Sequence, residues 1–296
     1  MTARPLAPAD LDAAYAVYAA DEMEDAGVLA IEREDLEGDW ARPSFDLATD
    51  SVGLFEAGAL LGAAEVTRGG MHAEGAVLPS ARGRGIGSWL AGWTETRAGA
   101  QATTVGQNVP AGSTADRFLV GRGYRTGHTA WVLELPDGRE VPQRGLPGGY
   151  SFATADDDRR VRGAHRVVQE AFGEWEGRSP ASFEDWAATT VNRPGTQPWQ
   201  LRLVEDGAGE VVAVAFTILD STGCGYVHQL AVDRRHRGRG LAQALLADGF
   251  GRARSHGATR SELSTDSRTG ALDLYLKVGM AVTQTWIHRV ADLPRP

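Results

Sequence analysis

The chain has 296 residues, a formal net charge of −9 and 42% hydrophobic residues, which suits two globular domains of ordinary size. The acidic charge argues against nucleic-acid binding, which requires a basic face. No apolar run approaches the length of a membrane span, and the first residues lack the apolar core of a signal peptide. A single cysteine, Cys224, forms neither an internal disulfide nor a metal cluster. We therefore expect a cytoplasmic protein without a metal site or a membrane partner.

The predicted elements follow one order, which occurs twice along the chain. An amphipathic helix opens each half, a glycine-linked hairpin follows, and then come a glycine-rich turn, a second helix and strands that alternate in polarity. In chain order the elements of the first half are a helix over 10–20, strands over 52–55 and 60–66, a helix over 86–98 and strands over 104–106 and 124–135. Those of the second half are a helix over 157–172, strands over 199–204 and 211–217, a helix over 241–256 and strands over 260–264 and 280–290.

Two segments repeat closely enough to indicate a duplication. Residues 76–87 match residues 231–242 position for position, with Gly83 opposite Gly238, and the tripeptide around Trp40 recurs around Trp186. Two copies of this length predict a tandem of complete α/β domains rather than a solenoid. The stretch 135–149 is rich in proline and glycine, which break helices and strands. We place the boundary there, with domains over 1–144 and 145–296.

The second copy contains a strand, a turn rich in glycine and arginine, and a helix start. Such a turn stacks backbone N–H groups at the positive end of a helix, and its glycines let a phosphate approach the main chain. The motifs G-x-G-x-x-G and GK[ST] of nucleotide sites are absent. The segment therefore predicts an anion-binding loop, whose residues are Arg235, Arg237, Gly238, Arg239, Gly240, Leu241 and Ala242.

The spacing of Arg235, Gly238 and Gly240 resembles the coenzyme A pyrophosphate loop of GCN5-related N-acetyltransferases (GNAT). The order of elements in both halves is similar to that fold, and the tandem layout resembles mycothiol synthase-like actinobacterial enzymes. The resemblance implies two GNAT domains, each a mostly antiparallel sheet flanked by helices. It also implies acetyl-coenzyme A as the cofactor and N-acetyl transfer as the activity, although fold likeness leaves the substrate open.

The two halves differ at the position of the general acid that the resemblance implies. In the family, a tyrosine four residues before a glycine protonates the departing thiolate, and Tyr275 matches that position before Gly279. A phenol can donate this proton through a short hydrogen bond. The first half carries Leu119 there, before Gly123, and leucine cannot donate a proton. We expect catalysis in the second domain and a degenerate first domain.

The family also implies main-chain contacts from the strand that precedes the loop. Backbone amides of Leu230 and Val232 are expected to take the pantetheine arm and polarise the acetyl carbonyl. Relatives often place a glutamate base on this strand, but that position is Tyr226 here. His228 lies two residues on and shares a strand face with Tyr226, so it is a candidate base, either directly or through water. A histidine that merely hydrogen-bonds within the sheet is an equal alternative.

The first half keeps part of a second loop. Ser80 stands where the second half has Arg235, while three glycines survive. The first domain therefore stays a candidate for a second cofactor site without catalysis. Its residues are Val77, Arg82, Gly83, Arg84, Gly85 and Gly87.

The leading interpretation is acetylation of a primary amine on a small molecule, by direct attack. The alternatives are mycothiol synthase-like acetylation of a cysteinyl amino-sugar conjugate, a non-catalytic acyl-coenzyme A sensor, and a protein acetyltransferase. The loop at 170–178 mixes carboxylates with an aromatic residue, which favours a protonated amine by charge and cation–π contact, or is a solvated turn. Monomer and homodimer remain equally open.

Overall fold

The computed structural model describes residues 1–174 and 180–294. They form two compact units. The first unit comprises Met1–Ala130 together with Gln284–Pro296, and the second comprises Trp131–Thr283. No helix in the described part of the chain is both long and apolar enough to cross a lipid bilayer.

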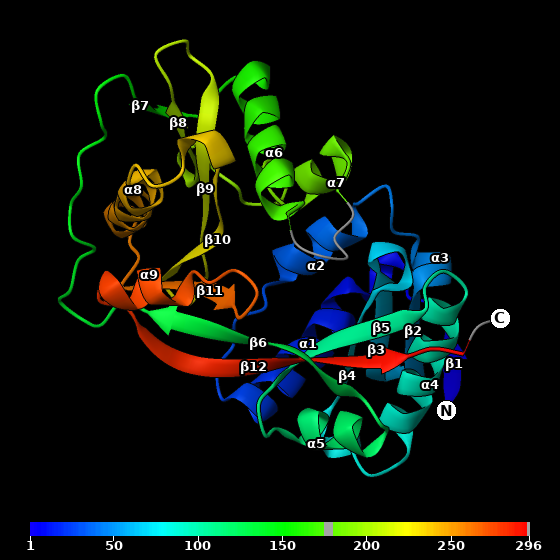
Figure 1. Cartoon of the computed structure of the whole chain (residues 1–296). Helices are drawn as coiled ribbons and strands as arrows, with labels where there is room; N and C mark the ends of the chain where they lie inside the picture. The colour runs from blue at the N-terminus through cyan, green and yellow to red at the C-terminus, as the bar shows by residue number, and fades with distance from the viewer. Residues whose placement is uncertain (175–179, 295–296) are drawn as a thin grey trace. The chain divides into compact units, whose positions relative to one another are not determined.

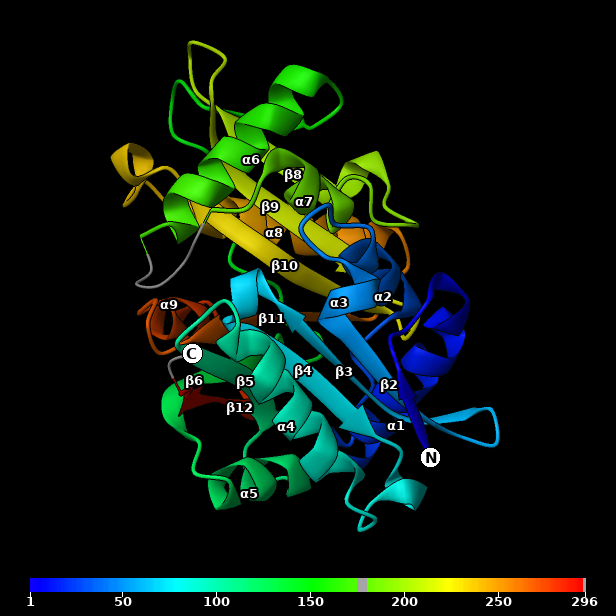
Figure 2. The same cartoon turned by 90° about the vertical axis from the view of Figure 1, so that its right-hand side faces the viewer.

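The first unit is a sheet covered by helices on both faces (Figure 2). Its successive elements are β1 (Thr2–Arg4), η1 (Pro8–Asp10), α1 (Leu11–Ala26), α2 (Arg33–Trp40), α3 (Leu47–Asp50), β2 (Ser51–Glu56), β3 (Ala59–Thr67), η2 (Arg68–Gly70), β4 (His72–Val77), η3 (Pro79–Ala81), α4 (Ile86–Gly99), β5 (Thr104–Pro110) and α5 (Thr114–Gly121). Two long strands, β6 (Arg125–Glu134) and β12 (Ala281–Asp292), each contribute residues to both units.

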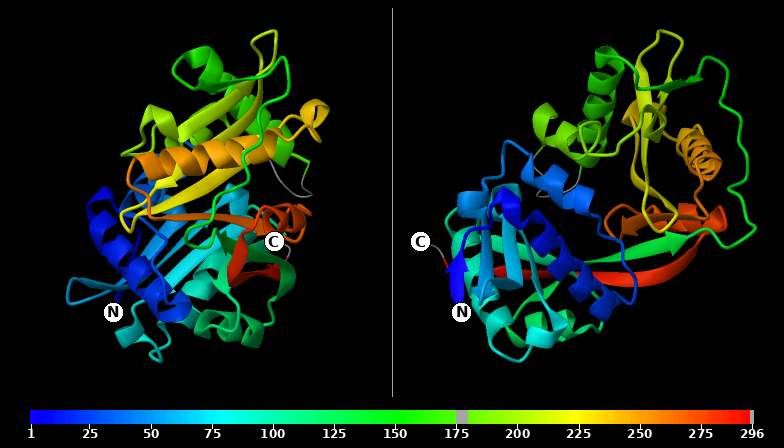
Figure 3. Two further views of the ribbon diagram at one scale, coloured as in Figure 1. Left: turned by 90° about the vertical axis from the view of Figure 1, so that its left-hand side faces the viewer. Right: turned by 180° about the vertical axis from the view of Figure 1, so that it is seen from behind.

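The second unit repeats this order, and Figure 1 shows its helices α6 and α8 on either side of β8, β9 and β10. Its elements are β7 (Ser151–Thr154), α6 (Asp158–Phe172), α7 (Phe183–Ala188), η4 (Pro198–Gln200), β8 (Leu201–Glu205), β9 (Val211–Leu219), β10 (Cys224–Val232), η5 (Arg234–His236), α8 (Leu241–Ser255), β11 (Arg260–Asp266) and α9 (Leu272–Lys277). The long segment between β6 and β7 is drawn in green in Figure 3.

Each unit takes a strand from the other half of the chain. In the first unit the order is β1-β2-β3-β4-β5 followed by β12, and in the second it is β7-β8-β9-β10-β11 followed by β6. Strand β12 pairs antiparallel with β5, from Trp286 opposite Pro110 to Asp292 opposite Thr104. In the second unit, Leu135 N–H donates to the Ser261 carbonyl at 2.9 Å. The boundaries of the two compact units therefore differ from the predicted domain boundary at residue 145, which separates the two copies of the sequence repeat.

Side chains that point alternately to the two faces of the central strands explain why helices pack on both faces of each sheet. In the first unit, Ala63 packs in a cluster with residues of α1, whereas its neighbour Ala64 packs with residues of α4. In the second unit, Val214 packs with residues of α6, and its neighbour Ala215 packs with residues of α8. Successive side chains of a strand point to opposite faces, so each sheet buries both of its faces.

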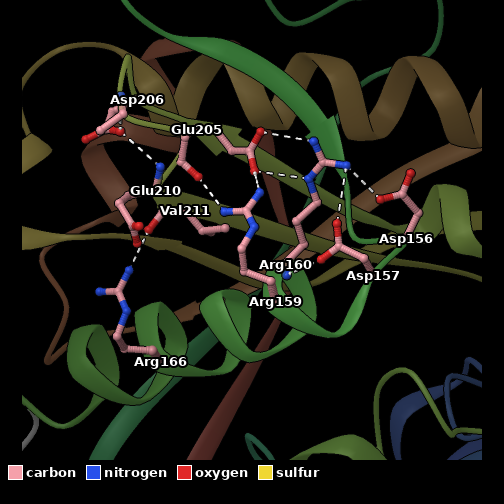
Figure 4. A network of polar contacts seen from close by, with 11 residues as sticks. Asp156, Asp157, Arg159, Arg160, Arg166, Glu205, Asp206, Glu210 and Val211 are labelled. Atoms are coloured by element: carbon pink, nitrogen blue, oxygen red, sulfur yellow. Dashed lines mark hydrogen bonds and ion pairs between the residues drawn. The ribbon is translucent and has the colours of Figure 1, made fainter.

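Arginines of α6 fix this helix on the second sheet (Figure 4). Helix α6 begins after Asp157, whose side chain caps it by accepting from the Arg160 N–H at 2.8 Å. The guanidinium of Arg160 donates to both carboxylate oxygens of Glu205, at 3.0 and 3.2 Å, and Arg159 donates to the same carboxylate at 2.9 Å. Glu205 ends β8 and is 7% exposed. These bonds hold the pKa of Glu205 below its ordinary value.

The predicted fold class, a mixed sheet flanked by helices, is confirmed in both units. Strands β4 and β5 pair in parallel, as do β10 and β11. The pairs β1–β2, β2–β3, β3–β4, β5–β12, β7–β8, β8–β9 and β9–β10 are antiparallel. The opening helix of the first unit runs to Ala26, six residues beyond the predicted end at Ala20. The strand expected to begin at Trp199 begins at Leu201, because residues 198–200 form a 3-10 turn.

Candidate active site

The glycine turn of the second unit presents an open helix end. Gly238 and Gly240 have φ angles of +74° and +83°, which glycine adopts without the strain other residues meet. Helix α8 starts after Gly240, and no side chain caps its first N–H groups. A Cβ added at Gly238 would meet nothing within 4 Å. This geometry fits an anion, since free N–H groups and the helix dipole both favour negative charge there.

The arginines of the turn are held at defined positions around this helix end. Arg235 turns back to bond Asp233 at 2.7 Å, and this hydrogen bond outweighs the opposing effect of burial and lowers the pKa of that carboxyl to about 2. Arg237 donates two bonds to Glu174, at 2.8 and 3.0 Å. Arg239 donates to the Tyr150 hydroxyl at 2.6 Å. The predicted cationic residues therefore flank the turn, and each is anchored by a neighbour in the second unit.

Next to this turn, strands β10 and β11 stop pairing. Their parallel register runs from Cys224 to Val227 and no further. Asp233 N–H donates to the Val212 carbonyl of β9 at 2.9 Å, and antiparallel strands alternate in the side to which their amides point. The N–H groups of Leu230 and Val232 therefore point away from β9, toward the side where β11 has diverged. These are the two amides that the sequence predicts as cofactor contacts.

His228 lies at an irregularity of β10. The register with β9 shifts between Val227 and Gln229, so His228 is the extra residue of a β-bulge. Its side chain is exposed, and its ring lies 6.2 Å from the ring of Tyr226 and 6.1 Å from that of Phe216. The bulge places the imidazole of His228 beside the point where β10 and β11 stop pairing.

Tyr275 lies in the short helix α9, in an apolar cluster with Val227, Leu263 and Leu133 of β6. It is 7% exposed. Burial raises the pKa of Tyr275 from 10 to about 12, and at either value the phenol is protonated at neutral pH. A buried, protonated phenol can serve as a hydrogen-bond donor or a general acid.

The first unit repeats the turn with nearly identical backbone geometry. Gly83 and Gly85 have φ angles of +75° and +83°, and helix α4 also starts without a side-chain cap. Arg82 and Arg237 both leave the preceding 3-10 turn in an extended conformation. The main chain of this loop therefore resembles that of the second unit.

Two carboxylates of α1 distinguish the first loop from the second. Asp21 and Asp25 accept from the two terminal nitrogens of Arg82, at 2.7 and 2.8 Å. Asp21 also accepts from the Val77 N–H at 3.3 Å, and Val77 corresponds to Val232. Negative charge therefore already satisfies the arginine and the strand amide of this loop.

The positions of α6 that match Asp21 and Asp25 are apolar. They are Val167 and Ala171, buried in one cluster with Val168. The carboxylate that pairs with Arg237 comes instead from Glu174, beyond the end of the helix. The two loops thus share a backbone but differ in the residues that pair with their arginines.

The carboxylates predicted to hold an amine are already paired. Glu170 accepts from Arg166 at 3.2 Å, and Glu174 binds Arg237. The rest of that predicted loop, residues 175–178, lies outside the described residues. The described carboxylates of the loop are therefore neutralised by arginines of the second unit.

Sequence reasoning missed a further arginine beside the turn. Arg144, in the segment between β6 and β7, lies so close to Gly240 that a Cβ added to this glycine would overlap its guanidinium. Tyr150 of the same segment shares a hydrogen bond of 2.9 Å with His236. Basic and aromatic residues in a proline-rich linker carry no distinctive spacing, so no motif identified them.

The chain resembles known acetyltransferases over both units. Residues 161–280 match the model of the acetyltransferase (GNAT) family. A mycothiol acetyltransferase of Salinispora tropica is 29% identical over 232 residues, covering 72% of this chain and 70% of that protein. A GCN5-related N-acetyltransferase of Sphaerobacter thermophilus superposes with a TM-score of 0.74 at 29% identity, covering 98% and 95% of the two chains.

A tandem GNAT protein from the clavulanic acid biosynthesis pathway shares the fold, with a TM-score of 0.73 at 18% identity, over 98% of each chain. The glycine turn at an open helix end, the diverging strands beside it and these similarities agree with one another. Residues 161–280 thus match the GNAT family of acetyltransferases, and the whole chain is similar in sequence and fold to GNAT proteins.

Proposed function

We propose that this protein transfers an acetyl group from acetyl-coenzyme A to a primary amine of a small molecule, and that its second unit does so. One contrast carries the proposal. In the first unit, Asp21 bonds both the Arg82 guanidinium and the Val77 N–H, whereas the corresponding position of α6 is the apolar Val167, which brings no carboxylate to the Val232 N–H. The domain 145–296 is then catalytic and the domain 1–144 degenerate.

In this proposal, several residues of the second unit bind the cofactor. Acetyl-coenzyme A supplies the acetyl group on a thioester. The N–H groups at the start of α8 hold its phosphates, assisted by Arg237, Arg239 and Arg144. The amides of Leu230 and Val232 donate hydrogen bonds along the diverging strands.

Two side chains donate or accept a proton in the proposed reaction. Tyr275 keeps a proton on its phenolic oxygen for the sulfur leaving group, since a phenol is protonated at neutral pH and burial raises its pKa further. His228, exposed at the bulge of β10, takes a proton from the attacking amine, directly or through water. Both groups belong to the second unit, and the position of Tyr275 in the first unit is occupied by Leu119.

The test is a calorimetric titration of acetyl-coenzyme A with a matched pair of variants. Gly83 and Gly238 have φ angles within one degree, and a Cβ at either meets nothing within 4 Å. Gly83→Glu and Gly238→Glu therefore introduce similar backbone strain and the same charge. We expect one binding site, which Gly238→Glu abolishes and Gly83→Glu preserves. Two sites, or loss of binding in Gly83→Glu, would contradict the assignment, and no binding to the wild type would refute the activity.

A second candidate reaction is favoured by the relatives that are named mycothiol acetyltransferases. In it, the acceptor is the amine of a cysteinyl amino-sugar conjugate. Tyr226 stands where those enzymes are expected to carry a glutamate base, which weighs against this acceptor. Comparing turnover of such a conjugate with that of simple alkyl amines separates the two candidates.

A further inference from the structure

The phenol of Tyr275 is held in place by apolar packing. No hydrogen bond from the described residues reaches its hydroxyl, and burial accounts for its raised pKa. Its neighbours in the apolar cluster include Val227 of β10, Leu263 of β11 and Leu133 of β6. A side chain without a polar partner takes its position from the shape of the packed groups around it. These neighbours therefore determine where the phenolic oxygen lies.

Leu133 reaches this cluster from the first half of the sequence. It lies in β6, the strand that follows α5 and ends at Glu134. The next residue, Leu135, donates its N–H to the Ser261 carbonyl at 2.9 Å, which fixes the end of β6 beside β11. Leu133 itself is completely buried. A second domain that began at the predicted boundary, residue 145, would therefore lack this side chain beside its tyrosine.

The corresponding position of the first unit carries a charge. Arg289 of β12 corresponds to Leu133, because each lies ten residues after the glycine with positive φ that follows the preceding helix. Arg289 stands opposite Gln107 of β5 in the antiparallel register. Its guanidinium donates to Asp116 at 2.6 Å and to the Thr126 hydroxyl at 2.7 Å. The first unit therefore fills this place with a partly buried ion pair.

Two further matching positions are polar in the first unit and leucine in the second. Gln107 and Leu263 are the fourth residues of β5 and β11. Asp116 and Leu272 each lie three residues before the position of the general acid, and Leu272 packs against the cluster that contains Tyr275. The fold accepts either version, because the ion pair satisfies its own buried groups and the leucines have none to satisfy. The apolar version occurs in the unit that carries the tyrosine.

An arginine at the place of Leu133 would disturb a general acid. A guanidinium donates hydrogen bonds but accepts none, so it would compete for the phenolic oxygen of Tyr275. Its positive charge would also lower the pKa of the phenol. A leucine leaves the phenolic O–H free to donate and fixes the ring by shape alone. The residue on β6 therefore suits proton donation, whereas Arg289 suits an ion pair.

We propose that Leu133 is a positioning residue, which holds the phenol of Tyr275 where it donates its proton, so that β6 from the first half of the sequence belongs to the catalytic unit. This inference rests on the proposed function, in which Tyr275 is the general acid. It gives the first half a part in catalysis that needs no cofactor in its own loop. Because the contact is apolar and remote from the glycine turn, it should affect kcat rather than cofactor affinity.

A pair of cavity variants tests the position of Leu133 in the fold. We expect Leu133→Ala to lower kcat about tenfold, because the phenol loses one wall, and to leave the dissociation constant of acetyl-coenzyme A unchanged. Leu203→Ala is the matched control, since Leu203 of β8 is equally buried but packs in the cluster beneath α6. The control should destabilise the protein to a similar extent in urea and keep kcat near that of the wild type.

A double-mutant cycle separates positioning from a general effect on the fold. If Leu133 acts through the hydroxyl, adding Leu133→Ala to Tyr275→Phe should lower kcat no further. Leu133→Met keeps the volume of the side chain and should retain kcat. Leu133→Val, a smaller deletion, should show the same dependence on Tyr275 if the alanine variant does not fold. Equal losses of kcat with and without the hydroxyl, or equal losses in Leu133→Ala and Leu203→Ala, would overturn the proposal.

The ring resonances of Tyr275 give a readout that needs no cofactor. They can be assigned by their absence in Tyr275→Phe, and Leu133→Ala should shift them while Leu203→Ala should not. A protein that acetylates amines but shows no such shift would refute the role of Leu133 alone. A wild type that binds no acetyl-coenzyme A would refute the proposed function, and with it the catalytic role of this contact, even where the ring resonances shift.

Discussion

Tyr275 and Leu119 occupy the same place at the ends of corresponding helices. The Met280 N–H donates to the Tyr275 carbonyl at 3.1 Å, and the Tyr124 N–H donates to the Leu119 carbonyl at 3.0 Å. Both side chains are buried, at 7% and 2% exposure. The two units therefore place a buried side chain in the same way at this helix end, and of the two side chains Tyr275 carries a hydroxyl while Leu119 does not.

Removing that hydroxyl should slow the chemical step. We expect Tyr275→Phe to lower kcat about a hundredfold, within the range for loss of a general acid, while the affinity for acetyl-coenzyme A stays near that of the wild type. Leu119→Met, a volume-conserving change at the matching site, serves as the control and should retain full activity. Steady-state kinetics together with calorimetry measure both quantities. An unchanged kcat in Tyr275→Phe would show that another group protonates the thiolate.

His228 should determine the acid limb of the pH–rate profile. If its imidazole takes the proton of the amine, kcat/KM of the wild type rises as this ring loses its own proton. His228→Gln should lower kcat/KM at neutral pH and flatten that limb. A profile whose limb keeps its position in His228→Gln would instead assign the limb to the amine substrate.

Arg144 should strengthen cofactor binding. Its guanidinium lies against Gly240 at the start of α8, where a phosphate would bring negative charge. We expect Arg144→Gln to weaken acetyl-coenzyme A binding about tenfold, the size of one charge-assisted hydrogen bond. Arg139→Gln, in the same linker and exposed, should have little effect. Equal losses in both variants would indicate general attraction by positive charge.

The carboxylates at the first loop should contribute to stability. Asp25 is 5% exposed in its side chain, pairs with Arg82 at 2.8 Å and accepts from the Ala115 N–H at 3.1 Å. Asp25→Asn should cost about 2 kcal/mol, because it leaves a partly buried guanidinium with one fewer charged partner. Asp12→Asn, on the same helix but 82% exposed, should cost much less. Urea denaturation compares the two, and similar losses would exclude a special role for the pair at the loop.

Glu65 should make stability depend on pH. Its pKa in the folded protein is about 8, raised by burial above the ordinary value of 4.5. A raised pKa means that the folded state binds more protons, so this stabilisation is full below about pH 4.5 and is lost as pH rises through 8. Relative to Glu65→Gln, the wild type should lose about 1.4 kcal/mol per pH unit across that window.

Glu56 should make stability depend on pH in the opposite direction. The ion pair with Arg84 lowers the pKa of this exposed carboxyl, so any contribution is present above its unfolded pKa and is lost as pH falls. Denaturation of Glu65→Gln over pH 5 to 8 and of Glu56→Gln over about pH 3 to 5 tests both directions. A wild type whose stability parallels that of Glu65→Gln would show that Glu65 is ionised in the fold.

The sequence by itself determined the features that depend on local chemistry. Repeated glycines at Gly83 and Gly238 predicted two turns, because positive φ angles favour glycine wherever the chain folds. Alternating polarity and helical periodicity predicted the order of elements, since each depends on neighbours a few residues apart. The placement of Tyr275 and Leu119 followed from their fixed spacing to a glycine at the helix end.

Only the tertiary structure decided the features that join distant segments. Strands β6 and β12 each enter the unit of the other half, and no local pattern specifies which sheet edge a strand will join. Asp21 reaches Val77 across 56 positions of the chain. Glu65 and Glu74 face each other because the hairpin register aligns them. These contacts of charged side chains depend on packing and strand register. Packing and register set the distances between residues that lie far apart in the sequence.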